Sequence, residues 1–176
     1  MGLRPAKCYH WDSPAYTRRS KNPADSFITG IPGTKLTHYN MGNMKGEYDT
    51  EVSVVSDMKI QIRHNALEAA RIATNKILEE NLGVNNYHFK VRVVPHHVMR
   101  ENVMATGAGA DRVQSGMRGA FGKPMGFAAR MNKNQAVFTV VLNKTDDKMK
   151  CVKRALKIAM SKLPGDMKIV IKPTNA

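Results

Sequence analysis

The chain has 176 residues, of which 42% are hydrophobic, and its 28 lysines and arginines against 14 acidic residues give a net charge of +14. This length fits one domain with extensions, and the apolar content suffices for a buried core, so wholesale disorder is excluded. The longest apolar runs fall well short of the roughly 20 residues that span a bilayer, and residues 1–21 lack the apolar stretch of a secretory signal. We therefore expect a cytosolic protein without a membrane span, in which Cys8 and Cys151 are free thiols.

The charge is distributed unevenly along the chain. Residues 1–46, 87–135 and 136–176 carry net charges of +5, +6 and +6, whereas residues 47–86 carry −3. An acidic block between basic ones indicates that one face is turned away from a polyanion. Nucleic acid is the favoured partner, because each phosphate neutralised by Lys or Arg releases condensed counterions. A membrane surface is a weaker alternative, since it favours a basic amphipathic helix with bulky apolar residues opposite.

Residues 1–46 are predicted to form an extended basic arm packed on the domain. Prolines and glycines recur through this segment, and no helical or strand period is sustained. Its cations alternate with aromatic residues, a mixture that can pair with phosphates while rings stack on exposed bases. Trp11 and Tyr16 can therefore either stack on bases or pack onto the domain.

Residues 47–176 are predicted to form a single α+β core domain. Alternating apolar residues indicate strands within residues 47–63 and at 89–93, 126–131, 135–142 and 168–172. The strands at 126–131 and 135–142 are expected to pair as a hairpin around residues 132–134. Strands mixed with two separate helices, without a regular βαβ alternation, are typical of the α+β class.

The first predicted helix begins at a capping box of Asn65 and Glu68 and ends at Gly83. Its predicted inward residues are Ala66, Leu67, Ala70, Ala73 and Ile77. The second helix is capped by Thr145 and ends at Pro164, and its predicted inward residues are Met149, Val152, Leu156, Ala159 or Met160, and Leu163. Its lysines and Arg154 form either a solvated face or an RNA-facing one.

Residues 96–125 are predicted to form a long internal loop. This stretch is rich in glycine and small residues and includes Arg100, Arg112, Arg118 and Lys123. A loop of this length is uncommon in a compact domain and is normally functional or disordered. We expect it to be mobile when free and ordered on its target.

Motifs of nucleotide and metal chemistry are incomplete. The run from Gly107 begins like a dinucleotide-binding fingerprint, but Arg112 replaces its third glycine. Gly122 and Lys123 resemble the end of a P-loop, but Pro124 stands where the magnesium-binding hydroxyl is required. The cysteines and histidines lack metal-ligand spacing, and Cys151 has no nucleophile motif around it. We expect a protein that is not an enzyme and needs no cofactor or metal.

Three runs together resemble one family. They are MGLRPAKCY at residues 1–9, IRHNALEAAR at 62–71 and, above all, AGADRVQSGMRGAFGKP at 108–124. The chain resembles the large-subunit ribosomal protein family numbered sixteen in the universal naming, in its archaeal and eukaryotic, ten-e or QM-like branch, a relative of bacterial L-sixteen. The resemblance spans essentially the whole chain, although Met125 and Phe127 stand where many relatives have more polar or smaller residues.

The resemblance implies an α+β fold of the hammerhead type, with a mixed sheet and two helices. It also implies binding to large-subunit ribosomal RNA near the aminoacyl-tRNA site and the central protuberance, contact with or approach to tRNA, and a role in late subunit assembly. Residues 102–118 would then project toward the peptidyl-transferase centre, where the chemistry belongs to the RNA. Implied partners are ribosomal RNA, neighbouring ribosomal proteins and assembly factors, with a monomer in isolation.

The candidate site residues form two sets. Predicted RNA contacts are Arg4, Lys7, Arg18, Arg19, Lys21, Lys35, Arg63, His64, Arg100, Lys123 and Arg130. The predicted loop residues toward tRNA are Gly107, Gly109, Arg112, Gln114, Gly116, Arg118 and Gly119. Arg112 and Arg118 would anchor the loop to phosphates while its glycines permit its path; Arg63 and His64 face either RNA or solvent at the helix entry.

Two other functions are compatible with parts of this sequence. A non-ribosomal RNA-binding protein or RNA chaperone would need the same positive charge. An RNA-modifying or nucleotide-dependent enzyme is disfavoured by the two broken glycine motifs.

Overall fold

The computed structural model describes residues 3–17, 22, 24, 28, 30, 33–102, 107–110 and 116–174. It contains two long helices, α1 (His64–Leu82) and α3 (Asp146–Ser161), and two short 3-10 turns, Ala6–Cys8 and Val84–Asn86. The strands are β1 (Asn40–Gly42), β2 (Thr50–Ser56), β3 (Ile60–Arg63), β4 (Tyr87–Val91), β5 (His97–Glu101), β6 (Lys123–Met131), β7 (Ala136–Leu142) and β8 (Met167–Pro173). No helix in the described part of the chain is long and apolar enough to cross a membrane.

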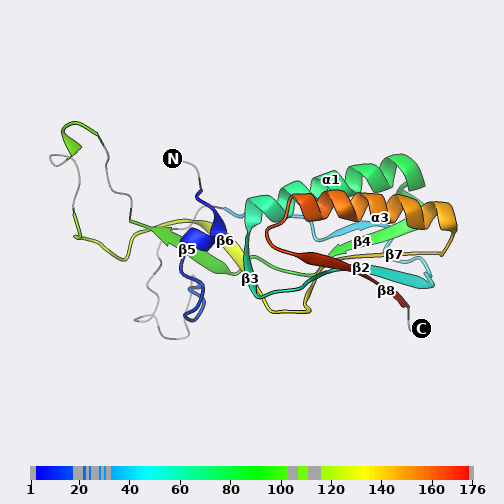
Figure 1. Ribbon diagram of the computed structural model, residues 1–176, viewed down its shortest axis with the longest axis horizontal. Coiled ribbons are helices and arrows are strands. Elements are labelled where there is room, and N and C mark those ends of the chain that lie inside the picture. The colour runs from blue at the N-terminus through cyan, green and yellow to red at the C-terminus, as the bar shows by residue number, and fades with distance from the viewer. Residues whose placement is uncertain are drawn as a thin grey trace.

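The strands form two antiparallel sheets. The larger has the order β1-β4-β7-β2-β8 and the smaller the order β3-β6-β5. Both helices cover the same face of the larger sheet, and the smaller sheet extends away from them toward the end where the described loop residues lie (Figure 1). The predicted α+β class is confirmed.

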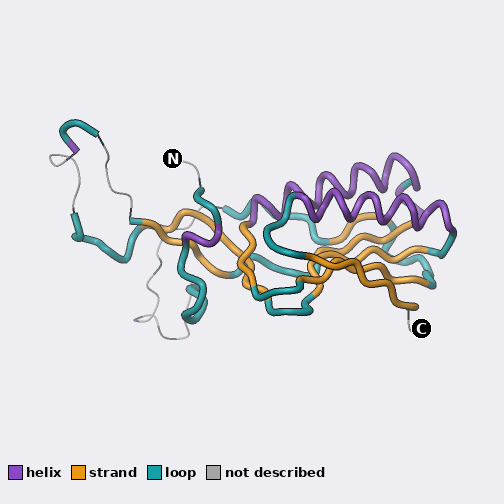
Figure 2. Tube along the Cα trace, in the orientation of Figure 1, coloured by secondary structure: helices purple, strands orange, loops and turns teal. Residues whose placement is uncertain are grey.

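The main core lies between the larger sheet and the two helices, which Figure 2 shows as two layers. Cross-strand partners Val52 and Val140 are both fully buried on this face. The rings of Phe89 and Phe138 pack 5.4 Å apart between centroids. From α3, Val152 and Leu156 are fully buried against them, so the apolar stripe predicted for this helix is confirmed.

The predicted start of α1 is wrong, whereas its end at Gly83 is confirmed. Arg63 occupies the N-cap, and Glu68 forms an ion pair with Arg71 at 2.6 Å instead of reaching back to the helix start. Asn65 lies inside the first turn, where its Oδ1 accepts a hydrogen bond from the Ala66 N–H. The capping box therefore does not form.

The buried stripe of α1 also departs from the prediction in its second half. Thr74 and Leu78 are fully buried, whereas Ile77 packs against the core while only partly buried and Ala73 is partly exposed. Thr74 tolerates burial because its hydroxyl donates to the carbonyl of Ala70 at 2.8 Å. Because Thr74 is polar, the spacing of the apolar residues does not reveal that this position faces the core.

The strands on either side of residues 132–134 do not form the predicted hairpin. The turn exists, with Asn134 at φ 62°, but β6 pairs with β3 and β5, whereas β7 pairs with β2 and β4. The backbone N–H of Ser56 donates to the Gln135 carbonyl, and the Ser56 carbonyl accepts from the Asn134 N–H. The chain thus passes from one sheet to the other at two neighbouring points, between β2 and β3 and between β6 and β7.

The predicted loop at residues 96–125 is shorter than expected. Its two ends are strands β5 and β6, which pair with Glu101 opposite Lys123. Val98 and Met99 are fully buried, which explains why this part of the segment is ordered as a strand. Between these two strands the structure describes residues 102, 107–110 and 116–122.

Candidate nucleic-acid interface

Two predicted RNA-binding arginines hold the backbone of the N-terminal arm. Arg63 Nη1 donates to the carbonyl oxygens of Leu3 at 2.8 Å and Arg4 at 3.0 Å. Arg130, on β6, donates from Nη2 to the carbonyl of His10 at 3.0 Å and from Nη1 to the carbonyl of Ser13. One guanidinium satisfies two carbonyls in each case, so the extended arm gains hydrogen bonds that it cannot make within itself.

Gln61 joins the arm and the sheet from the middle of β3. Its Nε2 donates to the Ala6 carbonyl at 3.2 Å, while its Oε1 accepts from Arg130 Nε at 3.2 Å. The side chain is 7% exposed, and both of its polar ends are satisfied. It therefore fixes the first arm turn and the orientation of Arg130 together.

A carboxylate on the smaller sheet pairs with the start of the arm. Glu101 Oε1 lies 2.8 Å from Arg4 Nε, and its Oε2 accepts from the Tyr9 hydroxyl at 3.0 Å. Tyr9 is buried beside Met99 and Ala128 in a second, smaller core. Desolvation raises the pKa of Tyr9, with a further contribution from Glu101. The phenol therefore stays protonated and donates.

His97 lies where the arm crosses the smaller sheet. Its Nδ1 accepts a hydrogen bond from the Tyr16 N–H at 3.0 Å, and the side chain is 2% exposed. Burial, followed by the charges of Arg130, His96 and Arg100, lowers the pKa of His97 to about 4, partly opposed by a hydrogen bond to the His10 backbone. The imidazole is thus neutral at physiological pH and serves the arm rather than a phosphate.

Arg100 connects the arm with the long loop. Its guanidinium carbon lies 4.1 Å from the ring centroid of Tyr16 and 3.6 Å from that of Phe121. The two rings themselves meet edge to face with centroids 5.6 Å apart. Arg100 also donates to the Phe121 carbonyl. The sequence left two roles open for Tyr16, stacking on a base or packing onto the domain. In the structure Tyr16 packs onto the domain.

His64 is buried, with 4% of its surface exposed, at the start of α1. Its Nδ1 accepts from the Lys35 N–H at 3.1 Å, and its ring packs against Phe127 with centroids 6.5 Å apart. Burial and the charges of Lys35 and Arg63 lower the pKa of His64. Arg63 and His64, the two residues predicted at this helix entry, both bind the arm backbone. Neither lies free on a solvated surface.

Besides Arg4, which is exposed but paired with Glu101, four predicted cations among the described residues face solvent. They are Lys7, Lys35, Arg118 and Lys123, all exposed. The four predicted loop glycines have positive φ, at 130° for Gly107, 78° for Gly109, 57° for Gly116 and 72° for Gly119, a conformation that side chains disfavour. Arg18, Arg19, Lys21, Arg112 and Gln114 lie outside the described residues.

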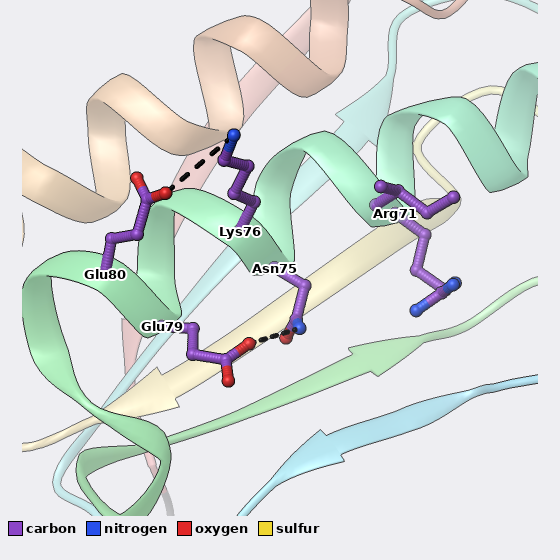
Figure 3. A pocket seen from close by; sticks show the side chains of 6 residues that line it. Arg71, Asn75, Lys76, Glu79 and Glu80 are labelled. Atoms are coloured by element: carbon purple, nitrogen blue, oxygen red, sulfur yellow. Dashed lines mark hydrogen bonds and ion pairs between the residues drawn. The ribbon is translucent and has the colours of Figure 1, made fainter.

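Glu79 and Glu80 of the acidic block lie on the outer side of α1 (Figure 3), and α1 runs away from the smaller sheet (Figure 1). There Lys76 pairs with Glu80 at 3.9 Å, and Asn75 donates to Glu79 at 3.4 Å beside a hollow of about 490 Å³. Carboxylates therefore offset the cations along this side of α1. On α3, Lys153, Arg154 and Lys157 are exposed.

Sequence reasoning missed the residues that receive or orient these arginines, namely Gln61, Glu101, Tyr9 and His97. One signal was available: Glu101 and Asp111 are the acidic residues of a segment with eight cations. A carboxylate so outnumbered by cations indicates an internal partner. Among the described residues, no group of three His, Cys, Asp or Glu side chains is placed to hold a metal ion.

A basic α+β domain that brings an extended arm and a glycine-rich loop together at one end is typical of proteins built into ribonucleoprotein particles. The model of one family, ribosomal protein L16p/L10e, matches residues 12–170. The chain belongs to this family, which confirms the resemblance noted in its sequence. The family is one of ribosomal proteins rather than enzymes, and membership makes the chain a structural constituent of the cytoplasmic ribosome.

Relatives match over nearly the whole chain. Large ribosomal subunit protein uL16 of Staphylothermus marinus is 49% identical over 174 residues, covering 98% of this chain and 95% of the relative. The proteins of the same name from Methanospirillum hungatei and Methanocella arvoryzae are 50% and 45% identical, covering 89% and 97% of this chain and 88% and 95% of the relatives.

Proposed function

We propose that this chain binds large-subunit ribosomal RNA through one continuous basic region made of the arm, the smaller sheet and the long loop. The region would lie near the aminoacyl-tRNA site and the central protuberance, with the loop reaching toward the peptidyl-transferase centre. The observation that supports this most directly is Arg100, which stacks on Tyr16 of the arm and Phe121 of the loop. It joins the two segments that carry the exposed cations into one surface.

The cations fall into two groups, those that hold the arm and those that are exposed, and this supports the same proposal. Arg63, Arg130 and Arg4 hold the arm in place, while Lys7, Lys35 and Lys123 are exposed. A phosphate backbone can then meet cations on a surface whose shape is already fixed, so less ordering entropy is lost on binding. Binding should weaken steeply with salt, because each phosphate contact releases counterions.

The loop is the part of the proposal that concerns tRNA. Arg118 is exposed, and the positive-φ glycines around it keep side chains off the backbone, which suits a path through crowded RNA. Arg112 and Gln114 enter the proposal on sequence alone. Replacing Arg112 and Arg118 together with Ala should impair translation or subunit maturation while domain folding stays intact. Loss of the cooperative unfolding transition in that variant would make the loop structural instead.

The remaining partners follow from the surface that RNA would leave uncovered. The outer side of α1, where carboxylates offset cations, is suited to solvent, a neighbouring ribosomal protein or an assembly factor. In isolation the chain would be a monomer.

The test is crosslinking of the tagged full-length chain in cells, followed by sedimentation in a high-salt gradient and sequencing of the attached RNA. We expect the protein to remain with the large subunit, with crosslinks in the neighbourhood of the peptidyl-transferase centre and central protuberance. Substituting Lys7, Lys35 and Lys123 with Ala should lower retention at high salt, whereas Lys172→Ala, on the outer strand β8, is the matched control. A protein at the top of the gradient with crosslinks scattered over messenger RNAs would indicate a chaperone.

A further inference from the structure

Trp11 is exposed although its neighbours in the arm are fixed. Its exposed fraction is 45%, and it lies outside both buried clusters of the described chain. The carbonyls of His10 and Ser13 on either side of it are held by Arg130. The backbone that presents this ring is therefore anchored, while the ring itself is left at the surface.

Beside the ring is an apolar hollow of about 310 Å³. Trp11, Ile60, Pro5 and Pro164 form its apolar walls, and Lys7 and Lys59 stand at its edge. Both lysines are exposed, and Lys59 Nζ lies 6.0 Å from the Trp11 ring centroid. A volume of this order is at the small end of ligand pockets and suits one planar group rather than a folded element.

We propose that this hollow receives a single unstacked base of RNA against Trp11, with the adjoining phosphates paired to Lys7 and Lys59. The inference rests on the proposed RNA-binding function and adds a defined contact to it. An indole face is a platform for any base, because every base has a π-face, and proline rings offer a second flat apolar surface. Two ammonium groups at the edge match the phosphates that flank such a base.

The charge of the hollow favours RNA over a peptide. Its lining contains two lysines and no carboxylate. The lining of the adjoining hollow of about 400 Å³ includes Asp12, whose side chain is 71% exposed. A proline-rich peptide could use an aromatic wall in the same way, but it would leave both lysines without a partner.

Trp11 is the only tryptophan of the chain, so its fluorescence reports on this site alone. The probe is a short single-stranded RNA titrated into the full-length protein, compared with an RNA of the same length and charge that carries abasic positions. Binding itself is followed separately by the anisotropy of a label on the RNA. We expect both RNAs to bind in a salt-dependent manner, but only the base-containing one to quench the tryptophan saturably.

Substitutions give the second arm of the test. Trp11→Ala should weaken binding of the base-containing RNA by roughly 5-fold or more, the effect expected when one stacking platform is lost, and should leave the abasic RNA unaffected. Ile72→Ala is the matched control, because Ile72 is 52% exposed on the outer side of α1. Unchanged circular dichroism and thermal unfolding of Trp11→Ala show that a loss is not due to misfolding.

The outcomes separate this inference from the proposed function. Equal quenching by both RNAs, or equal binding of Trp11→Ala and Ile72→Ala, contradicts a base in the hollow while RNA binding stands. Quenching by a proline-rich peptide but not by RNA assigns the hollow to a protein partner and likewise overturns it. Absence of salt-dependent anisotropy with either RNA removes the proposed function itself.

Discussion

Arg130→Met tests whether the arm is held by hydrogen bonds from the smaller sheet. Methionine keeps much of the length and apolar stem of arginine but removes all five N–H donors. In the structure those donors serve the carbonyls of His10 and Ser13 and the amide oxygen of Gln61. The substitution therefore removes these three hydrogen bonds, and the 3.2 Å contact of Arg130 Nη2 with His97 Nε2, without opening a large cavity.

The expected magnitude follows from the exposure of these groups. Hydrogen bonds that involve a charged group contribute about 1.5–3 kcal/mol each when buried. His10 is exposed, and Ser13 and Arg130 are partly exposed, so water replaces part of what is lost. We take about 1 kcal/mol for each bond, which gives a total of about 2–3 kcal/mol for docking of residues 3–16. That corresponds to a fall of roughly 30- to 150-fold in the equilibrium constant for docking.

The assay is hydrogen exchange of the backbone amides, read peptide by peptide. Protection should fall in the arm at amides such as that of Tyr16, while amides of β2 and β7 change little, because these strands belong to the larger sheet. Arg154→Met on the exposed side of α3 serves as the control. If the arm of Arg130→Met keeps the protection seen in the control, the small core around Tyr9 holds the arm by itself and the reasoning fails.

Three further predictions concern stability. The pKa of His97 is about 4 in the folded chain and about 6.5 in the unfolded one, so only the unfolded state takes up this proton as the pH falls from 6.5 to 4. The free energy of unfolding, measured in urea, should therefore decrease across this window by up to about 3 kcal/mol. The variant His97→Gln should show a flatter dependence on pH. Gly122→Ala should lower the melting temperature, because a Cβ there would lie 2.7 Å from the Glu101 carbonyl carbon at a φ of +78°. Leu156→Ala, at a fully buried site, should cost about 2–5 kcal/mol in a urea titration, whereas exposed Lys157→Ala should stay within about 0.5 kcal/mol.

The helices and strands could be predicted from the sequence better than the pairing of the strands. Alternation in β2, the apolar run of β7 and the apolar stripe of α3 are local patterns that the sequence shows directly. The wrong hairpin at residues 132–134 arose because a turn signal does not specify the partner of a strand. That choice depends on β3, which continues from β2 into the smaller sheet and pairs with β6. Pairing between distant segments leaves no periodic trace in either one.

The candidate site was predicted by charge, and charge alone does not separate binding residues from anchoring ones. Lys7 and Lys123 are exposed as an RNA-facing role requires, whereas His64 is buried and Arg63 is bonded to the arm backbone. An exposed lysine and an anchoring arginine raise the local positive charge equally. The partners that distinguish them carry no charge and are distant in the sequence: the Leu3 carbonyl lies 60 residues from Arg63, and Gln61 lies 69 residues from Arg130.

The chemistry of arginine and lysine explains why arginines near the arm bind within the chain while lysines there stay exposed. Arg63, Arg100 and Arg130 each engage at least two groups within the chain, because a planar fork of donors can reach adjacent carbonyls or lie flat on rings. An ammonium group is a strongly hydrated point charge, which favours solvent or a phosphate over a set of backbone carbonyls. Where the sheet meets the arm, arginines therefore fix the chain, whereas the exposed lysines remain for RNA. The exposed lysines Lys7 and Lys59 beside Trp11 belong to the second group, which is why that hollow is the place to look for a base.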